Sequence, residues 1–259
     1  MAQTNNSHRA QAGIIGALID AASAFAFLTV LPARWFTSEK PGRIFAWFPL
    51  VGLTIGVLLA GVASVAFLPP DVTRFVTLAA WVVLTGGLHL DGFADSCDGL
   101  LATTTPERRL EIMKDPRAGS WAVAGVVVLL LGKWAALGSI APMWLIAAPV
   151  AGRWAMAVAV YAFPNARPGG MGAYMRVGLG RLQIALATLT AAIVAVALGW
   201  QAAPALGASL GAVMLIGRWA AGRLGGGLTG DVYGALCELA ELVCLLALAM
   251  LPGTQYHSQ

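Results

Sequence analysis

The feature that most restricts the fold is a series of apolar runs, each about as long as a bilayer is thick. A helix needs about 20 apolar residues to cross the hydrocarbon core. We expect seven membrane spans, at approximately 44–68, 75–98, 119–138, 142–163, 183–200, 204–221 and 232–251. With 59% hydrophobic residues and a mean hydropathy of +0.78, little polar sequence is left to cover a soluble core. The sequence therefore predicts an all-α, polytopic membrane helix bundle.

The bundle is expected to form a single membrane-embedded domain over residues 1–259. Residues 1–12 are polar and are expected to be disordered. The segment 13–31 contains Asp20 and stops at Pro32. It is either an interfacial helix or an eighth, partly buried helix, and we favour the interfacial helix. The three cysteines have no CxxC spacing, so we expect buried free thiols.

Basic residues concentrate in alternate connections between the spans, and this asymmetry predicts the orientation. The basic connections hold Arg34, Lys40, Arg43, Arg108, Arg109, Lys114, Arg117, Arg167, Arg176, Arg181, Arg218 and Arg223. The opposite connections, near 69–73, 139–141 and 201–203, hold Arg74. Loops 99–118, 164–182 and 222–231 should therefore share the cytoplasmic side of a bacterial inner membrane. Topology alone accounts for the net charge of +4, and no nucleic-acid partner is needed.

Three of the 12 carboxylates, Asp91, Asp95 and Asp98, lie together in the stretch GGLHLDGFADSCDGLL. On a helix over 88–100 they fall within about 60° of one another. Each ionised aspartate near a bilayer centre costs about 2.5–3.5 kcal/mol, and the three also repel one another. A divalent cation such as Mg²⁺ prefers carboxylate oxygens and relieves both penalties. The alternative is a solvated helix end paired with Arg108 or Arg109.

A second acidic group lies in GDVYGALCELAELV. Asp231 and Glu238 are seven residues apart and share a helix face, and Glu241 follows three residues later. Asp231 follows Gly230 at an expected helix start, where a carboxylate can simply cap the helix. That explanation fails for Glu238 and Glu241, which lie two to three turns inside an apolar helix. We expect Asp231 and Glu238 to approach the first acidic group around one metal–diphosphate site.

A third charged segment, PERRLEIMKDPRAGS, directly follows the aspartate cluster. Its Glu111 and Asp115 are spaced i, i+4, with Arg117 nearby; a solvated amphipathic helix explains the same pattern. Lys133 and Arg153 stand within expected spans, where buried cations need anions: either these carboxylates or a substrate phosphate. Lys133 has the alternative of snorkelling outward.

The eight carboxylates named in these three segments, of the 12 in the chain, fall on one expected side and are accompanied by cations. This combination is typical of metal-assisted phosphoryl transfer, in which a metal and Arg or Lys neutralise phosphate oxygens. Residues alone do not identify the substrate.

Three blocks in order, HLDGFADSCDG, LEIMKDPRAGS and LTGDVYGALCELAEL, resemble the adenosylcobinamide-GDP ribazoletransferase (cobalamin synthase) family. The earlier FLTVLPARW and WFPLVGLTIG are similar to the opening of that family as well. The resemblance covers roughly residues 25 to 250. Phe93 and Ser96 are mild departures from the family's His-Leu-Asp-Gly-Leu-Ala-Asp-Thr. From the segment 164–181 no residue is carried over from the family pattern.

The resemblance implies a single catalytic domain that performs the last step of the cobalamin nucleotide loop pathway, with Mg²⁺ as cofactor. Adenosylcobinamide phosphate would be transferred from adenosylcobinamide-GDP to α-ribazole or α-ribazole 5′-phosphate, releasing GMP. A homo-oligomer is left open.

By the same resemblance, Asp91, Asp95 and Asp98 would bind metal and diphosphate. Asp231 and Glu238 would complete the metal shell or supply the base. The substrate would be held by Arg117, Lys133, Arg153, Glu111 and Asp115. His89 is a further candidate base, although a hydrogen-bonded structural histidine explains its apolar setting better.

Two other functions share part of this pattern. A CDP-alcohol phosphotransferase also uses aspartates in membrane helices, but its motif needs Asp-Gly-x-x-Ala-Arg. Here Ala94 comes one position early and Asp95 replaces the Arg. A cation-coupled transporter would place its acids near the bilayer midplane, whereas these acids gather at one expected end of the helices.

Overall fold

The computed structural model describes residues 2–32, 40–65, 67–167, 169 and 171–255, the side chains of 2–12 and 171 excepted. Its elements are α1 (Ala2–Leu28), η1 (Pro41–Trp47), α2 (Phe48–Ala63), α3 (Pro70–Leu84), α4 (Leu88–Leu101), α5 (Pro106–Ile112), α6 (Ser120–Leu137), η2 (Pro142–Ile146), α7 (Ala147–Ala162), α8 (Met171–Met175), α9 (Arg181–Leu198), α10 (Ala202–Arg223) and α11 (Gly230–Met250). Within these ranges the structure has no strand, only two isolated bridges.

Six apolar segments are long enough to cross a membrane: Pro41–Ala63, Ser120–Leu137, Pro142–Ala162, Arg181–Leu198, Ala202–Arg223 and Gly230–Met250. They correspond to six of the seven expected spans, with ends that differ by a few residues. The all-α, polytopic membrane bundle is confirmed.

The expected span 75–98 is wrong as one continuous helix. It consists of α3 and α4, which meet at 90°. The break lies at Gly86 and Gly87, whose φ angles of +62° and +67° are open to glycine and unfavourable for other residues. The apolar pattern continues through the break, which is why the sequence suggested a single span.

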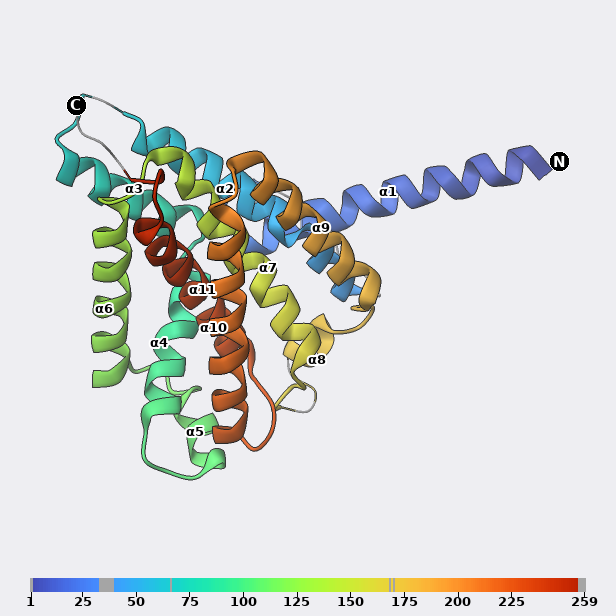
Figure 1. Ribbon diagram of the computed structural model, residues 1–259. Helices are drawn as coiled ribbons and strands as arrows, with labels where there is room; N and C mark the ends of the chain where they lie inside the picture. The colour runs from blue at the N-terminus through green and yellow to red at the C-terminus, as the bar shows by residue number, and fades with distance from the viewer. Residues whose placement is uncertain (1, 33–39, 66, 168, 170, 256–259) are drawn as a thin grey trace.

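The N-terminal helix α1 begins at Ala2, ahead of the interfacial helix expected over 13–31. Its apolar part, Gly13–Leu28, is shorter than the six spans. Asp20 is buried, and its Oδ2 lies 3.0 Å from Nε of Arg43 in η1. This ion pair links α1 to η1. Toward its N-terminus α1 extends away from the bundle (Figure 1). Disorder over 1–12 and an interfacial position for α1 stay predictions.

Helices α7 and α11 form the centre of the bundle. Nearly every residue of α7 from Ala147 to Val160 is buried, and α11 packs against α4, α6, α7 and α10. The sequence AAPVAGRWAMAVAV explains this position, since small side chains let neighbouring backbones approach closely.

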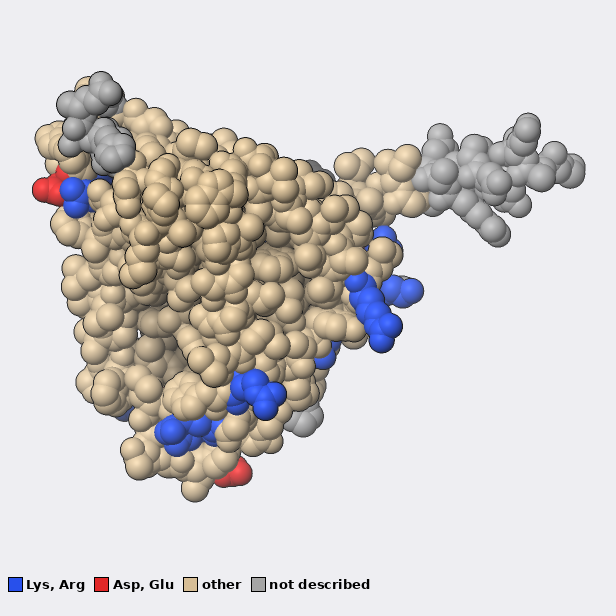
Figure 2. All heavy atoms as spheres, viewed as in Figure 1, with Lys and Arg blue, Asp and Glu red and all other residues tan. Residues whose placement is uncertain are grey.

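The three loops expected to share one side do meet. Leu228 pairs with Asn165 in a parallel bridge, and Nη2 of Arg167 donates to the carbonyl of Leu110. Nη2 of Arg223 donates to the carbonyl of Ala102. In Figure 2 most of the visible Lys and Arg atoms lie along the lower and right-hand edge, where α5, α8 and the start of α9 lie in Figure 1, and one further group lies at the upper left. The shared side is confirmed.

The break between α3 and α4 gives a stability prediction. A Cβ at Gly87 would meet no atom within 4 Å, so Gly87→Ala is disfavoured only by its backbone conformation, by about 1–2 kcal/mol. Gly211→Ala is the matched control, because a Cβ there also meets nothing and the helical backbone of α10 favours alanine by up to about 1 kcal/mol. Thermal unfolding in detergent should show opposite signs; the same sign for both would contradict this explanation of the bend.

Candidate active site

The aspartate stripe lies on α4, as the spacing predicts. Asp91 is exposed, and Asp95 and Asp98 are half-buried. None of the three forms an ion pair with Arg108 or Arg109. Arg108 Nη1 lies 2.7 Å from Oε2 of Glu111, and Arg109 Nη1 donates to the carbonyls of Gly99 and Leu100 at the end of α4. The alternative of a solvated helix end neutralised by these arginines is therefore not what the structure shows.

Asp98 differs from its two neighbours because both its oxygens are occupied. Oδ2 accepts from the backbone N–H of Gly119 at 2.6 Å, and Oδ1 accepts from that of Ala122 at 2.9 Å. The carboxylate thereby caps the first turn of α6, whose N–H groups have no partner within the helix. Asp91 and Asp95 accept no hydrogen bond from the described residues, so their oxygens are available to a ligand.

The second acidic helix packs directly on α4. A Cβ at Gly92 would lie 2.8 Å from the carbonyl oxygen of Asp231, so only glycine permits this approach. The cap of α11 is Thr229, whose Oγ1 accepts from the N–H of Val232. The expected alternative of Asp231 as the cap is therefore incorrect, and its carboxylate is turned to other partners.

Arg167 completes this group and was missed in the sequence. Its Nη1 lies 3.7 Å from Oδ2 of Asp231, and its buried Nε has no partner among the described residues. The charges that act on Asp95 are those of Asp91, Asp231 and Asp98, with Arg167 opposing them. The signal was weak: one arginine in a segment without a recognisable motif.

The predicted substrate-binding residues Glu111, Asp115 and Arg117 come together with Asp98 around a polar cavity of about 230 Å³, also lined by Arg108. Arg117 Nη2 lies 2.6 Å from Oδ2 of Asp115. The side-chain and backbone hydrogen bonds from Arg117 hold the pKa of Asp115 well below its usual range. The pair therefore stays ionised at neutral pH.

The structure does not bring Glu238, Lys133 and Arg153 to the aspartates. Lys133 Nζ lies 2.5 Å from Oε2 of Glu238 and also contacts Glu241, which pairs with Arg153. All four side chains are buried, and Glu238 and Glu241 lie seven and ten residues beyond Asp231 in α11. Their roles in metal or phosphate binding stay predictions, but each already has a counter-charge. Snorkelling of Lys133 is excluded, because only 3% of its side chain is exposed.

His89 lies between these two groups, on α4 against Gly234 of α11. It is buried, and its Nδ1 has no hydrogen-bond partner among the described residues. The structure therefore gives no support, at Nδ1, for the explanation of His89 as a hydrogen-bonded structural histidine. The role of His89 as a base stays a prediction.

Within the described residues, no three His, Cys, Asp or Glu side chains come close enough together to hold a metal ion. Asp91 and Asp95 provide two neighbouring carboxylates without partners. This donor set suits Mg²⁺, which usually takes one or two carboxylates and completes its shell with water and substrate phosphates.

Comparison with known proteins gives one consistent result. The family model described as cobalamin-5-phosphate synthase matches residues 20–249. A Deinococcus radiodurans protein is 43% identical over 228 residues, covering 86% of this chain and 82% of its own. Proteins of Roseiflexus sp. (38% identical; 96% of both chains) and Ectopseudomonas mendocina (41%; 88% of this chain and 97% of its own) are similar. All three are called adenosylcobinamide-GDP ribazoletransferase. No solved structure matches.

The buried ion pairs give a prediction. Lys133→Met leaves Glu238 and Glu241 with one cation between them, and removing one partner of a buried pair costs about 3–5 kcal/mol. Adding Glu238→Gln should recover most of this loss, because it removes the unpaired charge. Thermal unfolding of both variants tests this, with Lys114→Met as the exposed control. A double variant less stable than Lys133→Met would contradict the pairing.

Proposed function

Because the chain belongs to the cobalamin-5-phosphate synthase family, we propose that it transfers adenosylcobinamide phosphate from adenosylcobinamide-GDP to α-ribazole or its 5′-phosphate. A ribose hydroxyl oxygen attacks the phosphorus attached to the cobinamide arm. The bond between that phosphorus and the oxygen of GMP breaks, and GMP leaves. The hydroxyl proton passes to a carboxylate of the site.

One observation carries the proposal on the structural side: α4 packs against α11 so that the unpartnered carboxylates of Asp91 and Asp95 lie beside Asp231. Carboxylates without counter-charges suit a reaction whose substrate arrives with bound cations, which the carboxylates can then bind. They equally suit a reaction that needs a proton acceptor. The matched segment 20–249 contains this whole group.

Arg167 and the cavity arginines supply the opposite charge. Arg167 is held by Asp231 and the Leu110 carbonyl, so its planar guanidinium is oriented before a ligand arrives. Arg108 and Arg117 line the neighbouring cavity beside Asp98. A guanidinium presents paired donors that match phosphate oxygens. We assign the diphosphate to the space between Arg167 and this cavity.

We further propose Mg²⁺ as the cofactor, held by Asp91 and Asp95 with Asp231 beside them. A bound magnesium ion would neutralise phosphate oxygens and so reduce the repulsion that an incoming nucleophile meets. We assign the acceptance of the proton to Asp231 or Asp95. Asp98 positions α6 and with it one wall of the cavity.

The assay for this function is GMP release. Purified protein incubated with adenosylcobinamide-GDP, α-ribazole 5′-phosphate and Mg²⁺ should form GMP, and removing Mg²⁺ with a chelator should stop it. Folded protein that forms no GMP would overturn the activity; GMP formation unaffected by the chelator would overturn the cofactor alone.

Asp91→Asn and Asp95→Asn should each lower kcat/KM by more than tenfold, a loss above about 1.4 kcal/mol, without lowering the thermal midpoint. Stability is kept because removing a like charge relieves repulsion. The matched control is Asp71→Asn, which removes an exposed acid paired with Arg74 elsewhere on the surface. Near-normal turnover in either α4 variant would remove that aspartate from the site.

We propose that the loops around the site face the cytoplasm of a bacterial cell and that the chain lies in the inner membrane. The orientation follows from the basic loops. A membrane-impermeant thiol reagent applied to intact spheroplasts should label Ser139→Cys and not Thr103→Cys, both exposed positions at opposite ends of the bundle. The reverse labelling pattern would invert the topology, while the GMP assay would be unaffected.

A further inference from the structure

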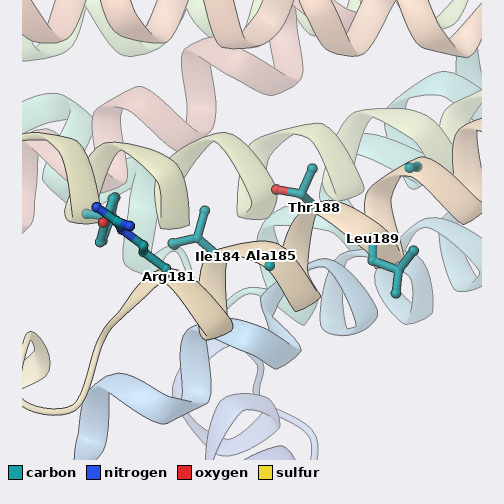
Figure 3. A pocket seen from close by; sticks show the side chains of 7 residues that line it. Arg181, Ile184, Ala185, Thr188 and Leu189 are labelled. Atoms are coloured by element: carbon teal, nitrogen blue, oxygen red, sulfur yellow. The ribbon is translucent and has the colours of Figure 1, made fainter.

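An apolar groove runs along the outer face of the bundle, away from the aspartates. It has a volume of about 600 Å³ and lies between Tyr161 of α7 and Arg181, Ile184, Thr188 and Leu189 of α9. Figure 3 shows Arg181 at one end and Leu189 toward the other. α9 is one of the membrane spans, so the groove opens into the hydrocarbon region.

Arg181 differs from most of the described arginines because it has neither a carboxylate nor a carbonyl partner among the described residues. Most other described arginines pair with a carboxylate or a carbonyl, as Arg117 does with Asp115 and Arg176 with the carbonyl of Phe163. For Arg181 the described residues provide neither an ion pair nor a hydrogen bond. Arg218 is also exposed and has no partner in the described part of the chain, but it does not line this groove.

The dimensions of the groove match one leaflet of a bilayer. From Arg181 to Ala192 the helix advances eleven residues, or about 16 Å at 1.5 Å per residue. Half of a hydrocarbon core of about 30 Å is about 15 Å. Arg181 begins α9 on the side of the basic loops, and Tyr161 near the end of α7 is at the same level. Arginine and tyrosine are typical of the interface, where the phosphates lie.

We propose that this groove binds an anionic phospholipid of the leaflet on the basic-loop side. The phosphate and anionic headgroup contact Arg181, and one acyl chain lies along Ile184, Thr188 and Leu189. Charge complementarity favours an anionic lipid, because an unpaired guanidinium lies at the end of an otherwise apolar groove. One such cation favours an anionic over a neutral headgroup by about fivefold.

The experiment uses the purified full chain and phosphatidylglycerol with a photoreactive group on its acyl chain. Cross-linked peptides identified by mass spectrometry should fall within 184–192. Unlabelled phosphatidylglycerol should compete about fivefold better than phosphatidylcholine, and inorganic phosphate should not compete. Competition by inorganic phosphate would show a simple anion site and would overturn the proposal.

Arg181→Gln should remove the preference for phosphatidylglycerol, and Arg218→Gln, the matched control, should keep it. Ala185→Trp fills the groove without changing charge, and it should reduce labelling by both lipids. Ala185 is exposed, so this variant tests the site even where Arg181→Gln fails to fold. Equal labelling by both lipids in the wild-type chain would mean ordinary annular lipid only and would overturn the proposal.

Discussion

The arrangement of the bundle depends on charges that have been removed from water. Lys133 of α6, Arg153 of α7 and Glu238 and Glu241 of α11 are all buried, and ion pairs among them join the three helices. Lys133 also lies over the ring of Trp81. An unpaired charge at such a position costs several kcal/mol, so the three helices keep the one arrangement in which the pairs form. That arrangement fixes α11, and α11 in turn sets where Asp231 meets α4.

The carboxylates therefore divide into two classes that the sequence does not distinguish. Glu238, Glu241 and Asp98 already have partners, which are cations for the two glutamates and the amides of α6 for Asp98. Asp91 and Asp95 have no such partners among the residues that the structure describes. A carboxylate that is paired with a buried cation, or that caps a helix, stabilises the fold. An unpaired carboxylate at the mouth of a site instead adds repulsion that only a ligand or cation relieves.

Much of this could be predicted from spacing. The helix over 88–100, the common face of its aspartates and the meeting of the three basic loops follow from helical periodicity and charge asymmetry. The break at Gly86 and Gly87 could not, because the apolar pattern is continuous across it. The pairing of Lys133 and Arg153 with the buried glutamates of α11 requires three helices to meet, and the position of Arg167 is set by the conformation of its loop. Neither feature produces a periodic pattern in the sequence.

The 90° bend explains how a membrane bundle can hold free carboxylates at all. A straight span through Asp91 and Asp95 would carry both into hydrocarbon on one face. With α4 a separate helix that ends at the basic loops, its stripe instead faces Asp231 and Arg167. A diphosphate approaching these acids meets repulsion of about 3–4 kcal/mol per charge pair at 4–5 Å and an effective dielectric of 20. One arginine cannot offset three carboxylates, and this imbalance is the physical ground for proposing a divalent cation there.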